Sequence, residues 1–235
     1  MTKIGTLYGA GVGPGDPELI TVKAWRLIST APVIAYLAAN GKESTARDIA
    51  SPFIPEDAVH LVIDVPMRVE RAPAQAAYDA GAAAIAGHLR AGRDVVMLCE
   101  GDPFFYGSFM YVFARLAKDY NTVVVPGVTA ITASAAAIRR PLSARNEVVK
   151  VLPATLDAGR LRGELASCES AAIIKVGRHL PKIRDILNDF DLASRASIIV
   201  KATHDGQRTM SLADVTGDVL PYFSTILVYT GSEPW

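Results

Sequence analysis

The chain has 235 residues, half of them hydrophobic, and its 24 basic and 24 acidic side chains give a formal net charge of zero. This balance excludes an intrinsically disordered tail and argues against nucleic acid as a partner, because that partner calls for a basic surface. The two cysteines, Cys99 and Cys168, are too few and too far apart to indicate a disulfide or metal framework, so a reducing compartment fits best.

The start of the sequence does not resemble a targeting segment. The first residues lead directly into a strand-like segment without a basic and apolar leader. No run of about 18 apolar residues occurs anywhere in the chain. We therefore expect a cytoplasmic protein with no membrane partner.

In the first half of the chain, short apolar and β-branched runs alternate with helical patterns. This alternation predicts an α/β domain with a mostly parallel sheet that is covered on both faces. The expected strands are Ile4–Gly9, Val33–Leu37, His60–Val65, Val95–Cys99 and Thr122–Val125.

Two helices of this half have clear ends. Asp16 is a suitable N-cap and Pro17 a suitable first residue, so the first helix is expected to begin here. Three apolar residues would form much of its buried stripe: Leu19, Val22 and Ile28. A second helix is expected at Ala74–Leu89, and Gly92 suits a left-handed C-cap just beyond it.

The second half changes character after Pro126. Helices are expected at Thr129–Ile138 and Pro181–Asp189. The strand-like segments are Glu147–Leu152, Ala171–Val176, Ala196–Lys201, Arg208–Leu212 and Thr225–Tyr229. No helix is evident between the last two, which predicts a mixed sheet with an antiparallel end. We therefore expect two α/β domains, residues 1–121 and 122–235.

The segment Gly9–Pro17 has a glycine at every second position up to Gly15, between the first strand and the first helix. Such a loop allows another molecule to approach the backbone closely, although a plain strand-to-helix turn has the same composition. A dinucleotide fingerprint needs a third glycine where Pro14 stands, and an acidic residue after the second strand, which ends in Leu37-Ala38-Ala39. A nicotinamide enzyme is therefore the weaker interpretation.

Two further loops follow strands of the same expected sheet. Glu100–Gly107 follows Val95–Cys99 and contains two carboxylates, two glycines and three aromatic residues, and Pro126–Ala130 follows Thr122–Val125. Ligands of open α/β sheets bind outside the carboxyl ends of strands, which favours a binding site here. Taken singly, each loop could instead be structural, with Asp102 in an ordinary turn or Thr129 as an N-cap.

Together, in this order, the loops resemble the tetrapyrrole (precorrin and uroporphyrinogen) methyltransferase family, which uses S-adenosylmethionine. The resemblance rests on Gly11–Thr21, Glu100–Gly107, Pro126–Ala130 and Lys175–Gly177, and covers nearly the whole chain. It implies two α/β domains, an active site in the cleft between them, and a homodimer.

Two other segments, Gly107–Tyr111 and Val151–Thr155, are most similar to family members that act on precorrin-2. The resemblance implies methylation of the C-20 meso carbon of precorrin-2, or of its cobalt form, to give precorrin-3A in cobalamin biosynthesis. The partner implied is thus a small-molecule tetrapyrrole.

The family's donor contacts can be carried over position by position. They fall on Pro14, Glu100, Gly101, Asp102, Phe105, Thr129, Ala130, Val176, Ala202 and Thr203. Two places depart from the family pattern. Many relatives have methionine where Val176 stands, and the segment from Ala202 resembles the glycine-containing turn of relatives only loosely.

Methyl transfer from a sulfonium to an electron-rich carbon depends mainly on alignment and needs no protein nucleophile. A base must still accept the proton displaced from carbon. The nearest candidates in sequence are Asp102, Tyr106, Tyr111 and Glu100, and the sequence does not choose among them.

The substrate implied carries eight carboxylates, so basic residues are expected to gather locally in this neutral protein. The candidates are Arg68, Arg71, Arg139, Arg140, Arg145, Lys175, Arg178 and Lys201, although each could also lie on a solvated surface. The four histidines show no ligand spacing, and no metal cofactor is indicated.

Two alternatives stay open. A methyltransferase of the same fold could act on another precorrin position or on a macromolecule, although the neutral charge counts against nucleic acid. A non-catalytic tetrapyrrole or nucleotide carrier could also have this fold.

Overall fold

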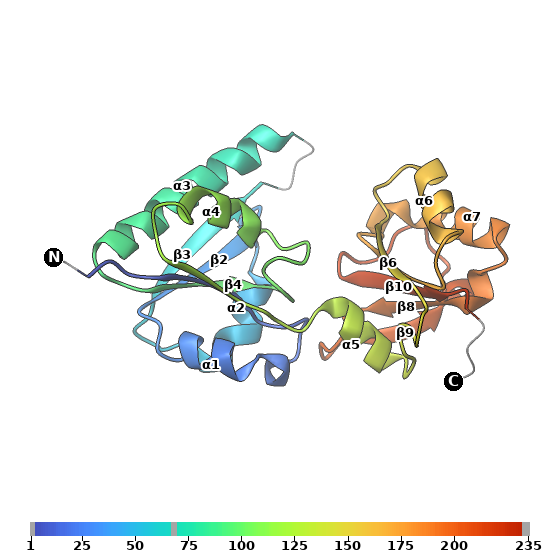
Figure 1. The fold of residues 1–235 in the computed structure, drawn as a ribbon, viewed down its shortest axis with the longest axis horizontal. Coiled ribbons are helices and arrows are strands. Elements are labelled where there is room, and N and C mark those ends of the chain that lie inside the picture. The colour runs from blue at the N-terminus through green and yellow to red at the C-terminus, as the bar shows by residue number, and fades with distance from the viewer. Residues whose placement is uncertain (1–2, 67–69, 232–235) are drawn as a thin grey trace. The chain divides into compact units, whose positions relative to one another are not determined.

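The computed structural model describes residues 3–66 and 70–231. The chain divides into two compact units, Met1–Thr129 and Ala130–Trp235, and each is described here by itself (Figure 1). One of the expected basic residues, Arg68, lies outside the described residues. Within the described part of the chain, no helix has the length and apolar character needed to cross a membrane.

The first unit is built on a parallel sheet of five strands in the order β3-β2-β4-β1-β5. The strands are β1 (Leu7–Gly11), β2 (Val33–Ala39), β3 (Val59–Val65), β4 (Val95–Cys99) and β5 (Thr122–Val125). Because β4 is buried along its whole length between β2 and β1, it reads as a continuous apolar run. The expected parallel α/β sheet is confirmed.

Helices cover both faces of this sheet. They are α1 (Val22–Ile28), α2 (Thr45–Ala50), α3 (Arg71–Arg90) and α4 (Phe109–Leu116), with short 3-10 turns at Pro17–Leu19 and Ser51–Phe53. One apolar cluster joins α3 and α4 to the sheet, and another joins α1 and α2 to it. Figure 1 shows the two pairs on opposite sides of the strands. All carboxyl ends of the strands therefore lie along one edge, where the loops meet.

The second unit has a mixed sheet in the order β6-β7-β10-β8-β9. Its strands are β6 (Val149–Pro153), β7 (Ser170–Ile174), β8 (Ala196–Val200), β9 (Arg208–Ser211) and β10 (Ser224–Tyr229). Only β6 and β7 are parallel neighbours, since β10 is antiparallel to both β7 and β8, and β9 is antiparallel to β8. The expected mixed sheet is confirmed.

Helices α6 (Ala158–Leu165) and α7 (Leu180–Asp189) join the larger apolar cluster of this unit, and α5 (Ala130–Ala137) packs on the other face. Short 3-10 turns occur at Gly177–His179, Ala193–Arg195 and Leu212–Asp214. The small side chains of α5 allow close packing on β10, which explains its alanine-rich sequence.

The division between the units falls at 129/130, whereas the sequence placed the domain boundary at 121/122. The reason is that β5 pairs along its length with β1 and so belongs to the first sheet. The chain leaves the first unit only after the Pro126-Gly127 turn.

Two expectations about the first elements need correction. The first strand begins at Leu7 rather than Ile4, because the Thr6 N–H donates to the Asp94 carboxylate (2.7 Å) instead of to a neighbouring strand. Asp16 caps a separate 3-10 turn, and α1 begins only at Val22, with Thr21 as its N-cap. Val22 is 69% exposed, so it is not part of the buried stripe.

This correction can be tested with Thr21→Ala. The Thr21 hydroxyl accepts from the Ala24 N–H at 3.2 Å, and loss of such a cap costs about 0.5–2 kcal/mol of unfolding free energy. Urea unfolding should show that loss for Thr21→Ala and almost none for Thr21→Ser or for Val22→Gln. A large loss for Val22→Gln would restore Val22 to the core.

Candidate functional site

Three glycines meet at the carboxyl ends of β1, β4 and β5. A Cβ on Gly11 would lie 2.6 Å from both the Gly101 carbonyl oxygen and the Gly127 Cα. A Cβ on Gly127 would lie only 2.0 Å from the Gly101 carbonyl oxygen. No side chain fits at Gly11 or Gly127, so the three loops contact each other backbone to backbone. We call Gly11, Gly101 and Gly127 the glycine cluster.

The loops after β1 and β4 are also joined by hydrogen bonds. The Gly101 N–H donates to the Gly13 carbonyl at 2.8 Å, and the Gly13 N–H donates to the Gly101 carbonyl at 3.3 Å. Gly101 has a φ of +63°, which favours glycine, yet the nearest atom to its Cβ position is the Val128 carbonyl oxygen at 3.7 Å. The side of Gly101 toward which a Cβ would point is thus open, whereas the corresponding sides of Gly11 and Gly127 are filled by backbone.

Asp102 ties the loop after β4 to the loop after β5. Its Oδ2 accepts from the Gly127 N–H at 3.0 Å, and its Oδ1 accepts from the N–H groups of Phe104 and Phe105 at 2.9 and 3.1 Å. Both carboxylate oxygens are therefore engaged by backbone donors within the first unit. Asp102 does not cap α4, which begins at Phe109 after Ser108. This geometry suits a positioning residue better than a proton acceptor.

The aromatic residues after Asp102 are presented outward by a tight turn. Phe104, Phe105 and Tyr106 are 48%, 40% and 45% exposed. Tyr106 has a φ of +56°, a conformation that is rare for an aromatic residue and often marks a functional loop. Gly107 follows because a Cβ there would lie 2.6 Å from the Pro103 carbonyl oxygen. The turn therefore holds the three rings at the edge of the sheet.

Tyr111, the second tyrosine expected in the site, lies on the first turn of α4. Its ring is half-exposed and lies 4.8 Å from the ring of Tyr78 on α3. Burial raises the pKa of Tyr78, and a hydrogen bond with the Ser108 side chain opposes that shift. The loop after Asp102 is thus connected to α3 through Tyr78.

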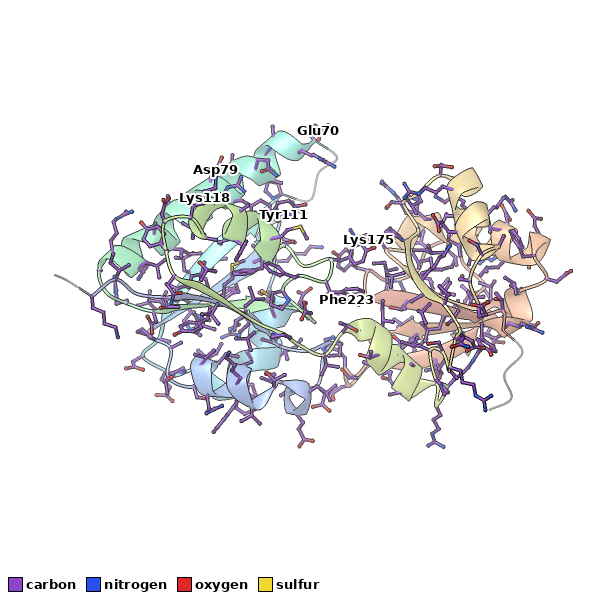
Figure 2. All side chains as sticks on the ribbon, viewed as in Figure 1. Glu70, Asp79, Tyr111, Lys118, Lys175 and Phe223 are labelled. Atoms are coloured by element: carbon purple, nitrogen blue, oxygen red, sulfur yellow. The ribbon has the colours of Figure 1, made fainter. Side chains whose placement is uncertain are left out.

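Arg115 on α4 also links α4 to α3 through hydrogen bonds. Its guanidinium donates to Asp79 at 2.6 Å, to the Gln75 side chain at 2.8 Å and to the Tyr111 carbonyl at 2.8 Å. Figure 2 labels Asp79 and Tyr111 on α3 and α4. No local sequence pattern predicts this contact, because Asp79 and Gln75 lie 36 and 40 residues before Arg115.

Glu100 differs from Asp102 in its environment. The residue as a whole is exposed, yet its carboxyl group is crowded enough that desolvation raises its pKa. The N–H of Ala46, on the first turn of α2, donates to this carboxylate and opposes the shift. A carboxylate with a raised pKa is a better proton acceptor than an ordinary one.

The remaining expected donor contacts of the first unit lie beside the glycine cluster. Pro14 directly follows Gly13, and the Thr129 Cα lies 4.0 Å from the Cβ position of Gly101. The structure therefore brings Pro14, Glu100, Gly101, Asp102, Phe105 and Thr129 onto the three loops at one edge of the first sheet.

The four expected donor contacts of the second unit differ in how exposed they are. Ala130 is exposed at the start of α5, and Thr203 is partly exposed in the loop after β8. Val176 and Ala202 are 0% and 8% exposed. The Val176 side chain packs in the core of the unit, and its carbonyl accepts from the His179 N–H.

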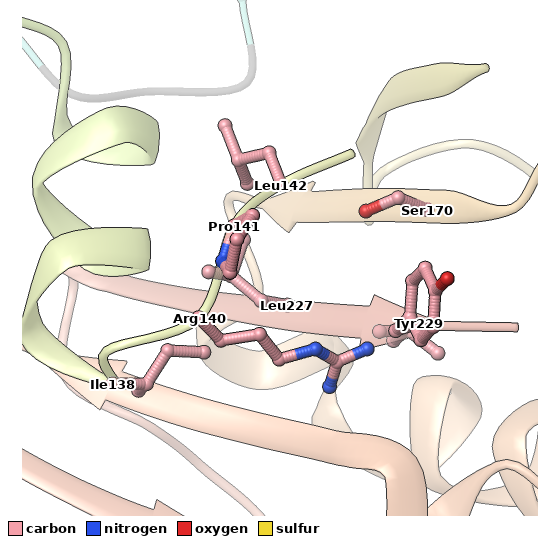
Figure 3. Close-up of a pocket in the computed structure, with 8 residues that line it drawn as sticks. Ile138, Arg140, Pro141, Leu142, Ser170, Leu227 and Tyr229 are labelled. Atoms are coloured by element: carbon pink, nitrogen blue, oxygen red, sulfur yellow. The ribbon is translucent and has the colours of Figure 1, made fainter. Parts of the chain in front are cut away.

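Arg140, one of the basic residues considered for the substrate, has a structural contact within the second unit. Its guanidinium lies 4.4 Å from the centre of the Tyr229 ring, where burial lowers its pKa, and the Tyr229 hydroxyl donates to Glu147. Figure 3 shows Arg140 and Tyr229 at a small pocket between the chain before β6 and β10. With a volume of about 10 Å³, this pocket has room for about one water molecule and none for a donor or tetrapyrrole.

Within residues 3–66 and 70–231, no group of three or more His, Cys, Asp or Glu side chains is placed to hold a metal ion. The loops at the glycine cluster contribute backbone, the Glu100 and Asp102 carboxylates and aromatic rings.

Taken together, a parallel sheet with a glycine-lined loop edge and a second, mixed sheet define a two-unit α/β protein with a candidate site at the strand ends of the first sheet. A family model described as "Tetrapyrrole (Corrin/Porphyrin) Methylases" matches residues 6–215, and the chain belongs to this family.

Two relatives and one solved structure illustrate the similarity. The cobalamin biosynthesis protein CobIJ of Mycobacterium bovis is 41% identical over 98% of this chain and 47% of that protein, so the chain spans about half the length of this relative. The precorrin-2 C(20)-methyltransferase of a Sinorhizobium species is 39% identical over 96% of this chain and 95% of that protein. The uroporphyrin-III C-methyl transferase of Thermus thermophilus, solved with S-adenyl homocysteine, has a TM-score of 0.70 at 24% identity, covering 96% and 92% of the two chains.

The role of Asp102 can be tested with Asp102→Asn. The amide cannot accept at both of its ends, so either the Gly127 bond or the two turn bonds are lost, at about 1.5–3 kcal/mol for each bond to a charged group. We expect lower stability in urea and weaker binding of S-adenosylmethionine by calorimetry. Unchanged stability and donor affinity with a loss of turnover would instead identify Asp102 as the proton acceptor.

Proposed function

We propose that this chain transfers a methyl group from S-adenosylmethionine to the C-20 meso carbon of precorrin-2, or of its cobalt form, giving precorrin-3A in cobalamin biosynthesis. Family membership and the near full-length similarity to a precorrin-2 C(20)-methyltransferase support the reaction and the substrate. The observation that carries the chemistry is the glycine cluster, where three strand ends meet and one side of Gly101 is left open beside exposed aromatic rings.

These residues fit a donor of this class. When bound, S-adenosylmethionine supplies an electrophilic methyl group that needs no activation by a protein nucleophile. The loops after β1, β4 and β5 would hold it chiefly by backbone contacts around Gly101, while the contacts of Asp102 fix those loops in advance. Orientation of this kind can supply an effective molarity on the order of 10⁵–10⁸ M.

The substrate assignment is tested by incubating the full chain with methyl-labelled S-adenosylmethionine and enzymatically prepared precorrin-2, with and without cobalt. Mass spectrometry and NMR should locate one label at C-20. Label at another macrocycle position would move the protein to a different specificity in the family. Transfer only to a macromolecule, or tight donor binding with no transfer, would favour the two alternatives named above.

We propose Glu100 as the group that accepts the displaced proton, because Asp102 is occupied by backbone donors and burial raises the pKa of Glu100. A raised pKa means that the ionised, accepting form is present only above that pKa. Turnover should therefore rise with pH through a pKa above the usual range for glutamate.

Glu100→Gln should remove that rise and reduce kcat by about 10²–10⁴, with donor affinity nearly unchanged. Stopped-flow turnover across pH 4 to 8 and donor calorimetry at pH 7 measure the two effects. A large loss of donor affinity without a change in the pH profile would make Glu100 a donor contact instead. Tyr106→Phe and Tyr111→Phe test the remaining candidates in the same assay.

Ala130 and Thr129 give a steric test of the donor site. Ala130 is exposed at the start of α5, so leucine is tolerated by the fold but fills space in front of the helix. Ala130→Leu should raise the Kd for S-adenosylmethionine by tenfold or more, equal to about 1.4 kcal/mol, and Thr129→Ala should cost roughly 0.5–1.5 kcal/mol. Parental affinity in a folded Ala130→Leu protein would exclude the helix start from the site.

Val176, Ala202 and Thr203 remain proposed donor contacts of the second unit, and a homodimer remains a prediction for ultracentrifugation. A reducing, cytoplasmic location also remains a prediction. It is supported by Cys99 and Cys168, which are both buried and unpaired with each other.

A further inference from the structure

Lysine residues follow two strands of the second sheet in the same unusual backbone conformation. Lys175, directly after β7, has a φ of +56°, and Lys201, directly after β8, has a φ of +51°. A glycine would adopt this conformation without cost, whereas a side chain makes it unfavourable. Each of these positions therefore holds a lysine against a backbone preference for glycine.

The register of the sheet places these lysines at one edge. Ile226 of β10 is paired with Ile173 of β7 on one side and with Ile198 of β8 on the other, so β7 and β8 run in the same direction at the same level. Lys175 and Lys201 therefore leave the sheet at nearly the same height. Two strand spacings separate them, or about 10 Å.

Hydrogen bonds hold both strand ends to one segment of the chain. The Lys201 N–H donates to the Phe223 carbonyl at 2.8 Å, and the Leu220 N–H donates to the Gly177 carbonyl at 3.2 Å. Figure 2 shows Lys175 and Phe223 at the same end of the sheet. The stretch from Leu220 to Phe223 thus fixes the loops after β7 and β8 together, which keeps the two lysine backbones in a constant relation.

Basic side chains gather at these strand ends, although the whole protein is neutral and Asp205 lies exposed in the loop after Lys201. Residues 170–184 contain no acidic side chain, and Arg178 lies exposed in the turn after Lys175. None of the ion pairs among the described residues includes Arg178 or Lys201. Burial lowers the pKa of His179, and the charges of Lys182 and Arg178 lower it further. We call Lys175, Arg178 and Lys201 the basic edge.

We propose that the basic edge binds peripheral carboxylates of the tetrapyrrole substrate, with Lys175 and Lys201 as specificity-determining residues that select macrocycles rich in carboxylates. This inference rests on the proposed function, because only that function supplies a polycarboxylate substrate. Two lysines whose strands lie about 10 Å apart can contact separate carboxylates of one macrocycle. The methyl donor, which carries a single carboxylate, has no need of both.

The test measures binding of uroporphyrin, which has eight carboxylates, and coproporphyrin, which has four, to the full chain by porphyrin fluorescence. Lys175→Met and Lys201→Met keep the apolar stem and remove the charge. Each should raise the Kd for uroporphyrin about tenfold, equal to about 1.4 kcal/mol, and reduce its dependence on salt. The preference for uroporphyrin over coproporphyrin should shrink, while the Kd for S-adenosylmethionine stays within about twofold.

Five further variants separate the effect of charge from an effect on folding. Lys175→Arg and Lys201→Arg keep the charge and should retain most of the affinity. Lys118→Met removes an exposed lysine of the first unit, beyond the end of α4, and should change nothing. Lys175→Gly and Lys201→Gly remove the cost of a side chain at a positive φ, so these variants should unfold at the same or a higher temperature than the parent protein. They should bind uroporphyrin as weakly as the methionine variants.

The outcomes distinguish this inference from the proposed function. If the parent protein methylates precorrin-2 and the methionine variants bind uroporphyrin like Lys118→Met, the basic edge is overturned and the proposed function stands. If the parent protein fails to methylate precorrin-2 but the lysine variants lose uroporphyrin binding as expected, the basic edge stands without that function. Loss of uroporphyrin binding by Lys118→Met as well would overturn the inference in favour of general charge attraction.

Discussion

The contact between the Asp102 carboxylate and the Gly127 N–H is the interaction on which the candidate site depends. It joins the loop after β4 to the loop after β5, although β1 lies between these two strands in the sheet. The loops can approach this closely only because Gly11 and Gly127 carry no side chain. A buried backbone N–H left without an acceptor is costly, so this carboxylate both satisfies Gly127 and sets the spacing of the loops. Backbone packing of this kind costs little entropy when a ligand arrives, since the loops are already in place.

The two sheets offer different chemistry at their strand ends. In the first unit, the strand ends present glycine backbone and aromatic rings, which suit a neutral or zwitterionic ligand held close to the main chain. In the second unit, β7 and β8 end in lysines, which suit an anionic ligand held by long side chains. Methyl transfer between a compact donor and a polycarboxylate acceptor calls for both kinds of surface. A neutral protein can supply them because its charges are unevenly distributed along the chain.

Much of this organisation is predictable from sequence, because its signals are local. Buried parallel strands read as apolar runs, and the β4 run Val95–Cys99 matches the structure at both ends. Gly92 has the expected left-handed φ of +76° after α3. The three glycine-containing loops were predicted as one site because parallel strands bring their carboxyl ends to the same edge.

Other features depend on partners distant in sequence and could not be predicted. The start of β1 is decided by Asp94, and the fastening of α3 to α4 by Arg115, Asp79 and Gln75. The start of α1 was misplaced because Asp16-Pro17 is a valid beginning for either an α-helix or a short 3-10 turn. Arg140 appeared in sequence as a cation for substrate, and only the fold reveals the Tyr229 ring beneath it.

The two cysteines lie in different units, so local opening of each unit can be measured separately. Cys99 is buried at the end of β4, directly before Glu100, and burial together with the nearby carboxylates of Asp102 and Glu100 raises its pKa. Cys168 is buried in the core of the second unit, where desolvation likewise raises its pKa. Thiols that are protonated and covered react slowly with alkylating reagents until the surrounding structure opens. The rate of alkylation of each thiol therefore reports how often its own unit opens. A ligand that stabilises the glycine-lined loops should slow the alkylation of Cys99.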